Sequence, residues 1–273
     1  MFNPNPRIET ILIASRHVCH VIDDALINPD DLVDYAGQHH GRFEETTHNA
    51  YPGPELRMPD EFSAQLDAFF TRHLRGAFDV RRTERMYSRL AITATPPERL
   101  APSQSICHVD RLSVDPRHRI VASVLYLFRD ERLGGTSFYA PKHPPDTIMP
   151  LIVDAGRMDA ETFRARYGIE TGYITASNAW FEKIATVPAR YNRIIFYEGT
   201  LFHSGEIAHP ELLSRDPRVG RLSLNGFFTC RRNLAPGCSG RCFHWWSRIS
   251  PRAPGASTSA WGLSRRSLVS ARP

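Results

Sequence analysis

The chain has 273 residues, of which 41% are hydrophobic and 23% charged, a composition that excludes fibrous, collagen-like and wholly disordered proteins. The formal net charge of +5 is uneven, because residues 231–273 hold eight arginines and no acidic side chain. Subtracting these eight from the 34 basic residues leaves 26 against 29 acidic ones. A mildly acidic body is a poor match for a phosphate backbone, so we expect no nucleic-acid partner.

The chain is not expected to enter a membrane. Its apolar runs are short, as at residues 11–14, whereas a bilayer-spanning helix needs about 20 residues. The N-terminal residues have neither the basic nor the apolar region of a secretory signal. We therefore expect a cytoplasmic protein. Its oligomeric state is not visible in the sequence.

The first third of the chain predicts supporting helices ahead of a β-rich region. Asn28 and Pro29 precede a helical pattern over residues 30–39. A second helix is predicted over residues 60–75, where apolar side chains recur at steps of three and four.

From Met86 onward the pattern changes to short runs of β-branched and aromatic residues between turn residues. Many short strands with such punctuation indicate a sandwich or barrel. Residues 140–188 are read as an insertion, with one helix over 159–167 and a second near 177–184. The predicted strands are 86–93, 106–110, 119–128, 136–139, 193–197, 201–204 and 221–229.

We predict one domain over residues 1–230, with a jelly-roll core at about 86–229. Residues 231–273 are rich in Ser, Arg and Pro and show no apolar periodicity. The alternatives for this tail are a functional basic extension, a disordered one, and a stretch translated from a shifted reading frame.

Three side chains form a candidate metal site. His108 and Asp110 are two residues apart on a predicted strand, so they project from the same face, about 7 Å apart along the chain. His203 lies on a later strand of the same region. Two histidines and one carboxylate on one side of a metal are typical of non-haem iron(II) oxygenases, because three positions stay open. Taken singly, each histidine is more often an ordinary core or surface residue.

Two further residues could hold an organic acid at such a metal. Arg221 begins a predicted strand, and its forked guanidinium suits the distal carboxylate of 2-oxoglutarate. Arg218 is the rival for this role. Tyr126 could place a phenol beside the same carboxylate, or be a core aromatic residue.

Together these segments resemble Fe(II)/2-oxoglutarate-dependent oxygenases of the prolyl 4-hydroxylase-like branch. The likeness rests on His108-Val109-Asp110, Val124-Leu125-Tyr126-Leu127, the Gly134-Gly135 turn, His203 and Arg221. It implies a double-stranded β-helix, or jelly roll, of cupin-like form. By this resemblance, iron would be bound by His108, Asp110 and His203. 2-Oxoglutarate would be bound by Arg221 and Tyr126. The family's Tyr-Leu-Asn segment is matched only partly, because Phe128 replaces the asparagine.

The resemblance implies a 2-oxoglutarate-dependent dioxygenase that uses Fe(II), 2-oxoglutarate and O2, with ascorbate as a candidate reductant. It would hydroxylate an unactivated C–H bond of an amino acid, peptide or small metabolite and release succinate and CO2. Residues 140–188, with Trp180 and Phe181, are lid candidates. The alternatives are a cupin-type metal-binding sensor without oxygenase activity, a metal-dependent hydrolase, and a purely structural jelly roll.

Overall fold

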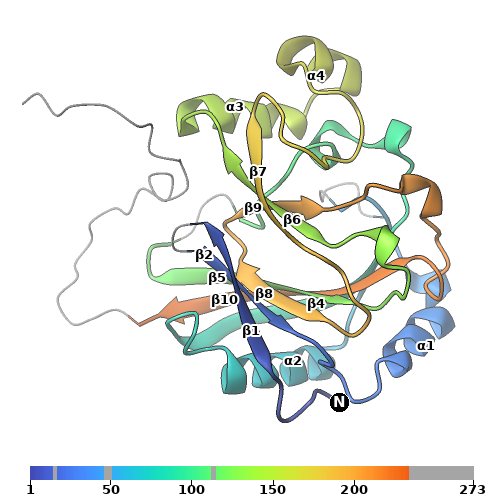
Figure 1. The fold of residues 1–273 in the computed structure, drawn as a ribbon, viewed down its shortest axis with the longest axis vertical. Coiled ribbons are helices and arrows are strands. Elements are labelled where there is room, and N and C mark those ends of the chain that lie inside the picture. Colours follow the sequence, from blue (N-terminus) through green and yellow to red (C-terminus); the bar gives the residue numbers. More distant parts are fainter. Residues whose placement is uncertain (15–16, 46–50, 112–114, 234–273) are drawn as a thin grey trace, which may run out of the picture.

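The computed structural model describes residues 1–14, 17–45, 51–111 and 115–233, which form two antiparallel sheets with helices outside them (Figure 1). In spatial order the larger sheet consists of β1 (Ile8–Ala14), β2 (His17–Ile22), β8 (Ile194–Glu198), β5 (His118–Tyr126), β10 (Arg221–Arg232), β4 (Val80–Thr93) and β3 (Glu55–Arg57). The smaller sheet consists of β7 (Phe181–Val187), β6 (Thr136–Pro141) and β9 (Phe202–Gly205).

The chain passes back and forth between the two sheets. After β4 in the larger sheet, the strand predicted over residues 106–110 is not formed, and His108 makes only an isolated bridge to His203 in β9. Regular pairing does not continue, because the Asp110 N–H donates to the carbonyl oxygen of Gly199, which lies outside β9. The chain then runs through β5 in the larger sheet, β6 and β7 in the smaller, β8 in the larger, β9 in the smaller and β10 in the larger. This winding is that of a double-stranded β-helix, so the predicted fold is confirmed.

Two helices brace the N-terminal side, as predicted. α1 (Asp30–Gln38) and α2 (Asp60–His73) match the expected ranges closely. α2 lies along the outer face of the larger sheet (Figure 1), where the Phe70 ring packs 4.7 Å from Phe228 and 5.9 Å from Phe196, centroid to centroid. Burying one such side chain stabilises the fold by roughly 1.5–3 kcal/mol. The helix therefore holds the sheet that carries Arg221.

The predicted insertion is partly wrong. α4 (Ala160–Tyr167) matches the helix expected over 159–167, whereas α3 (Pro145–Ala155) was not predicted. Both helices lie at the β7 end of the molecule (Figure 1). The second helix expected near 177–184 is absent, because these residues lead into β7, a strand of the core. Ile184 is an extra, bulged residue of β7 opposite Phe138 and Tyr139 of β6, and it shifts the pairing of the two strands. The strict alternation that marks a strand is therefore lost there, and the spacing of Phe181 and Ile184 looks helical.

Phe181 packs inside the molecule, and the half-buried Trp180 packs against its edge. The Phe181 ring is fully buried, with its centroid 5.1 Å from that of Phe202. The Trp180 indole N–H donates to the carbonyl oxygen of Tyr167 at 2.8 Å. Their expected lid role is therefore not favoured.

The two ends of the domain also differ from the prediction. β1, β2 and β3 were missed, although they widen the larger sheet beyond the jelly-roll core. β10 continues to Arg232, so the first two residues of the predicted tail belong to the sheet. Residues 234–273, and with them almost all of the tail, lie outside the described residues.

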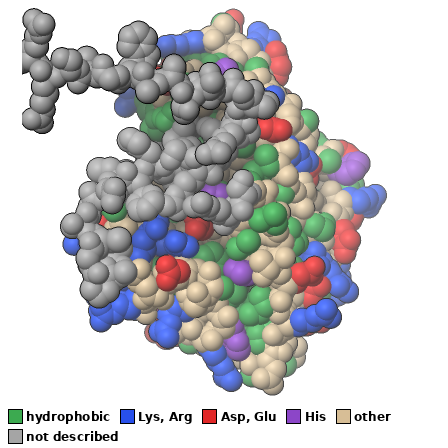
Figure 2. Space-filling view, turned by 60° about the vertical axis from the view of Figure 1, so that its left-hand side comes forward, with side chains coloured by type: hydrophobic (Ala, Val, Ile, Leu, Met, Phe, Trp, Pro, Cys, Tyr) green, Lys and Arg blue, Asp and Glu red, His purple; other side chains and the backbone are tan. Residues whose placement is uncertain are grey.

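In the described part of the chain, no helix is long and apolar enough to span a bilayer. On the uncovered part of the face in Figure 2, basic and acidic side chains are interspersed.

Candidate metal centre

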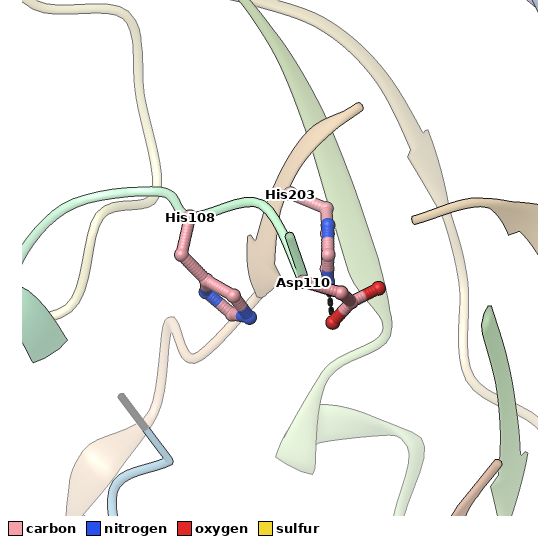
Figure 3. Close-up of side chains that lie close together, drawn as sticks. All are labelled: His108, Asp110 and His203. Atoms are coloured by element: carbon pink, nitrogen blue, oxygen red, sulfur yellow. Dashed lines mark ion pairs between the residues drawn. The ribbon is translucent and has the colours of Figure 1, made fainter. Parts of the chain in front are cut away.

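Backbone pairing brings His108, Asp110 and His203 together (Figure 3). The N–H groups of His108 and His203 each donate to the other's carbonyl oxygen, at 3.0 and 2.9 Å, and the ring centroids are 4.4 Å apart. Two residues further on, the Asp110 N–H donates to the Gly199 carbonyl oxygen at 2.8 Å. One donor atom from each side chain lies within 4.8 Å of the other two. The three groups can therefore share one metal ion.

The charges at this centre reflect its burial. The His203 and Asp110 side chains are 7% and 8% exposed, and His203 Nε2 lies 3.7 Å from Asp110 Oδ1. Burial lowers the pKa of His203 to about 4. Burial, helped by the neighbouring His203, lowers the pKa of His108 to about 4. Both imidazoles are therefore neutral at pH 7, the form that binds metals. Burial raises the pKa of Asp110 to about 6, against the lowering effect of His108 and Arg89.

The unsatisfied atoms fit a cation. Asp110 Oδ2 is buried without a hydrogen-bond partner, which is costly unless something positive binds it. His203 Nδ1–H donates to the Leu201 carbonyl oxygen at 2.8 Å, so the lone pair of this neutral ring is on Nε2, beside Asp110. One carboxylate and two neutral imidazoles are a donor set that suits iron(II).

Gly199 makes room for the carboxylate. A Cβ atom at this position would lie 2.4 Å from Asp110 Oδ2 and 3.3 Å from Asp110 Cβ. A residue with a side chain would therefore push the carboxylate out of place. No motif in the sequence marks this glycine.

The three side chains line a cavity of about 350 Å3, and Arg221 lines it too. Arg221 is buried, and its guanidinium donates to the carbonyl oxygens of Leu133, Gly134 and Gly135 and to Thr93 Oγ1. Its Cζ lies 5.5 Å from the centroid of the Phe128 ring. Among the described residues it forms no ion pair, so its charge has no carboxylate beside it. A buried, uncompensated guanidinium is a site for an anion.

The other two predicted candidates lie elsewhere. Arg218 is exposed, does not line the cavity, and has its guanidinium against Gly37. Tyr126 is fully buried and also does not line the cavity. Its hydroxyl hydrogen bonds with Thr136 Oγ1 at 2.8 Å, and Thr136 is a lining residue.

Tyr51 is a lining residue that sequence reasoning missed. Its hydroxyl hydrogen bonds with Thr93 Oγ1 at 2.9 Å, the same oxygen that accepts from Arg221 at 3.2 Å. Burial raises the pKa of the Tyr51 phenol, so it stays protonated and can donate. Tyr51 belongs to no predicted strand or motif, so no sequence signal links it to Arg221.

A family model described as "Family of unknown function (DUF6445)" matches residues 4–228. This chain belongs to that family. The matched region runs from the N-terminal segment into β10 and so includes the whole metal centre and Arg221. A comparison with curated proteins finds no match.

Among solved structures, the chain is similar to a prolyl-4-hydroxylase from Pseudomonas putida, with 18% identity, a TM-score of 0.41, and coverage of 80% of this chain and 95% of the other. It is also similar to HygX from Streptomyces hygroscopicus with nickel, 2-oxoglutarate and hygromycin B bound (13% identity, TM-score 0.40, coverage 79% and 83%). EvdO2 from Micromonospora carbonacea var. aurantiaca, complexed with 2-oxoglutarate, is similar at 11% identity and a TM-score of 0.40, with coverage of 84% and 98%.

Proposed function

We propose that this protein is a non-haem Fe(II)/2-oxoglutarate-dependent dioxygenase. The observation that carries the proposal is that one cavity holds two complementary groups. One is a His-Asp-His centre with an unsatisfied, buried carboxylate oxygen, and the other is a buried guanidinium with no acidic partner among the described residues. The first feature calls for a cation and the second for an anion. A metal chelated by an organic acid supplies both.

His108, Asp110 and His203 would hold iron, leaving three positions for the oxoacid and O2. Iron with 2-oxoglutarate and O2 supplies oxidative decarboxylation to succinate and CO2, coupled to hydroxylation of a substrate C–H bond. Ascorbate would serve as an external reductant. The protein would hold iron and 2-oxoglutarate in a cavity sheltered from bulk water. The proposed substrate is an amino acid, a peptide or a small metabolite.

Arg221 has the donors that the distal carboxylate needs. Its Nε–H, one N–H of Nη1 and one N–H of Nη2 are used by protein acceptors. One N–H on each terminal nitrogen has no partner in the described part of the chain, which suits a carboxylate with two oxygens. Tyr51 shares Thr93 with this guanidinium, and Tyr126 supports the same wall of the cavity through Thr136. We propose that Arg221 binds the distal carboxylate of 2-oxoglutarate and that Tyr126 contributes indirectly, through Thr136.

The test compares Arg221→Gln with Arg218→Gln. Calorimetry with Mn(II), which is not oxidised, should show 2-oxoglutarate binding to the wild type. Arg221→Gln should weaken this binding about 10- to 100-fold, because charge-assisted hydrogen bonds contribute roughly 1.5–3 kcal/mol. Mn(II) affinity should not change. Arg218→Gln should behave like the wild type.

Equal 2-oxoglutarate affinity in the wild type and Arg221→Gln would contradict the proposal and favour a metal-binding module of the cupin type. With iron(II), ascorbate and O2, the wild type should also release succinate from 2-oxoglutarate. Succinate release no faster than with metal alone would count against an oxygenase.

A further inference from the structure

The outer part of the cavity contains a second arginine, which is neither a candidate metal ligand nor part of the proposed oxoacid site. Arg89 on β4 lies opposite Asn225 on β10, and both line the cavity. The Arg89 side chain is 22% exposed, compared with 8% for the Asp110 side chain at the metal centre, and the neighbouring Tyr87 is exposed. Arg89 thus lies between the buried centre and the solvent, where a substrate would enter.

The Arg89 guanidinium is held in one orientation by its neighbours. Nη1 donates to Glu55 Oε2 at 2.5 Å, and the Glu55 side chain is only 6% exposed. Its Cζ lies 4.8 Å from the centroid of the Phe227 ring. The Phe227 ring in turn stacks on Tyr87 with centroids 5.0 Å apart. A charged group fixed before binding loses little conformational entropy when a ligand arrives.

Most of the donors on Arg89 have no partner among the described residues. Of its five N–H groups, one contacts Glu55 and one reaches the Tyr87 hydroxyl, at 3.4 Å. The remaining donors belong to a side chain that lines the cavity next to Asn225 and the two rings. A planar fork of donors beside an aromatic wall matches a carboxylate attached to an apolar group.

We propose that Arg89 is a specificity-determining residue that binds a carboxylate of the primary substrate, so that the substrate is an organic acid or an amino acid with an apolar portion lying against Phe227 and Tyr87. This inference rests on the proposed function. It narrows the substrate to molecules with an anionic group, in contrast to neutral or cationic ones.

The probe is benzoate, which combines a carboxylate with a ring, compared with the neutral benzamide and the cationic benzylamine. Each is titrated into protein saturated with Mn(II) and 2-oxoglutarate, so that Arg221 is already occupied. We expect benzoate to bind at least about 10-fold more tightly than benzamide or benzylamine, as a charge-assisted hydrogen bond requires. Arg89→Gln should remove this preference while 2-oxoglutarate affinity stays within about twofold of the wild type.

Arg57→Gln is the matched control. Arg57 pairs with Arg89 across β3 and β4, but its side chain is 73% exposed and bonds Asp60 instead of lining the cavity. It should keep the wild-type preference for benzoate. Arg89→Lys should bind benzoate more weakly than the wild type, because an ammonium lacks the fork. This second variant decides the question if Arg89→Gln does not fold.

The possible failures are distinguishable. If the wild type does not bind 2-oxoglutarate, the proposed function is wrong and this inference falls with it. If 2-oxoglutarate binds but benzoate and benzamide have equal affinity, or Arg89→Gln and Arg89→Lys both bind benzoate as the wild type does, the inference alone is overturned. A preference for benzylamine would assign recognition to Glu55 and would also overturn it.

Discussion

At the scale of single residues, metal binding should be sensitive to a substitution of Gly199, which lies beside Asp110. Gly199→Ala would place a methyl group 2.4 Å from Asp110 Oδ2 and so displace the carboxylate. We expect metal affinity to fall by at least about 10-fold, as when residues that orient metal ligands are changed. Calorimetric titration with Mn(II) measures this.

Gly76→Ala is the control, because a Cβ at this exposed turn would meet no atom within 4 Å. It should bind Mn(II) like the wild type. Unchanged Mn(II) affinity in Gly199→Ala would mean that Asp110 is not a ligand.

Tyr51 and Tyr126 should differ in how much each contributes to the affinity for 2-oxoglutarate. The Tyr51 hydroxyl is at the cavity wall and shares Thr93 with Arg221, whereas the Tyr126 hydroxyl acts through Thr136. We expect Tyr51→Phe to weaken 2-oxoglutarate binding by roughly 5- to 10-fold, about the worth of one hydrogen bond. Tyr126→Phe should weaken it less. The reverse order in calorimetry would give Tyr126 the direct role that the sequence motif implies.

Among the strands, the junction of β2 and β8 depends on an ion pair. Asp23, just after β2, accepts from Arg193, just before β8, at 2.6 Å to Oδ1 and 3.0 Å to Oδ2. The hydrogen bonds from Arg193 lower the pKa of Asp23 below its usual value. The carboxylate therefore stabilises the fold above pH ~4, and this contribution is lost as the pH falls through the lower folded-state pKa.

Asp23→Asn should therefore lower the free energy of unfolding by about 1 kcal/mol at pH 7, a value reduced because the carboxylate is partly exposed. The difference from the wild type should shrink below pH ~4. Urea unfolding at pH 7 and pH 3 measures both. Glu170→Gln, which removes an exposed pair with Arg164, should change stability little at either pH. If Asp23→Asn lowered the free energy of unfolding equally at pH 7 and pH 3, the charge of Asp23 would not be involved.

For the whole molecule, we expect the described residues to be sufficient for the fold and the site. In the described residues the last strand, β10, ends at Arg232, and the match to the family model ends at residue 228. A chain shortened to residues 1–233 should unfold in one cooperative transition and bind Mn(II) and 2-oxoglutarate with the affinities of the full chain. Loss of either binding event would mean that residues 234–273 contribute to the site.

The local pattern of the chain was sufficient for α1, α2, α4 and most strands of the jelly-roll core, and it marked His108 and Asp110 as a candidate pair. Amphipathic spacing, turn residues and a His-x-Asp pair are properties of neighbouring residues, so they can be read along the chain. A resemblance spread over several segments then indicated that His203 and Arg221 belong with His108 and Asp110.

Contacts between segments that are distant in the sequence became visible only in the tertiary structure. β7 looked helical because the bulge at Ile184 is a property of a strand pair, not of either sequence. Arg221 and Arg218 are three residues apart, and only folding buries the first in the cavity and leaves the second exposed. Tyr51, Arg89 and Gly199 act through contacts with side chains far along the chain. Such contacts depend on how the sheets close around the cavity, which no local pattern records.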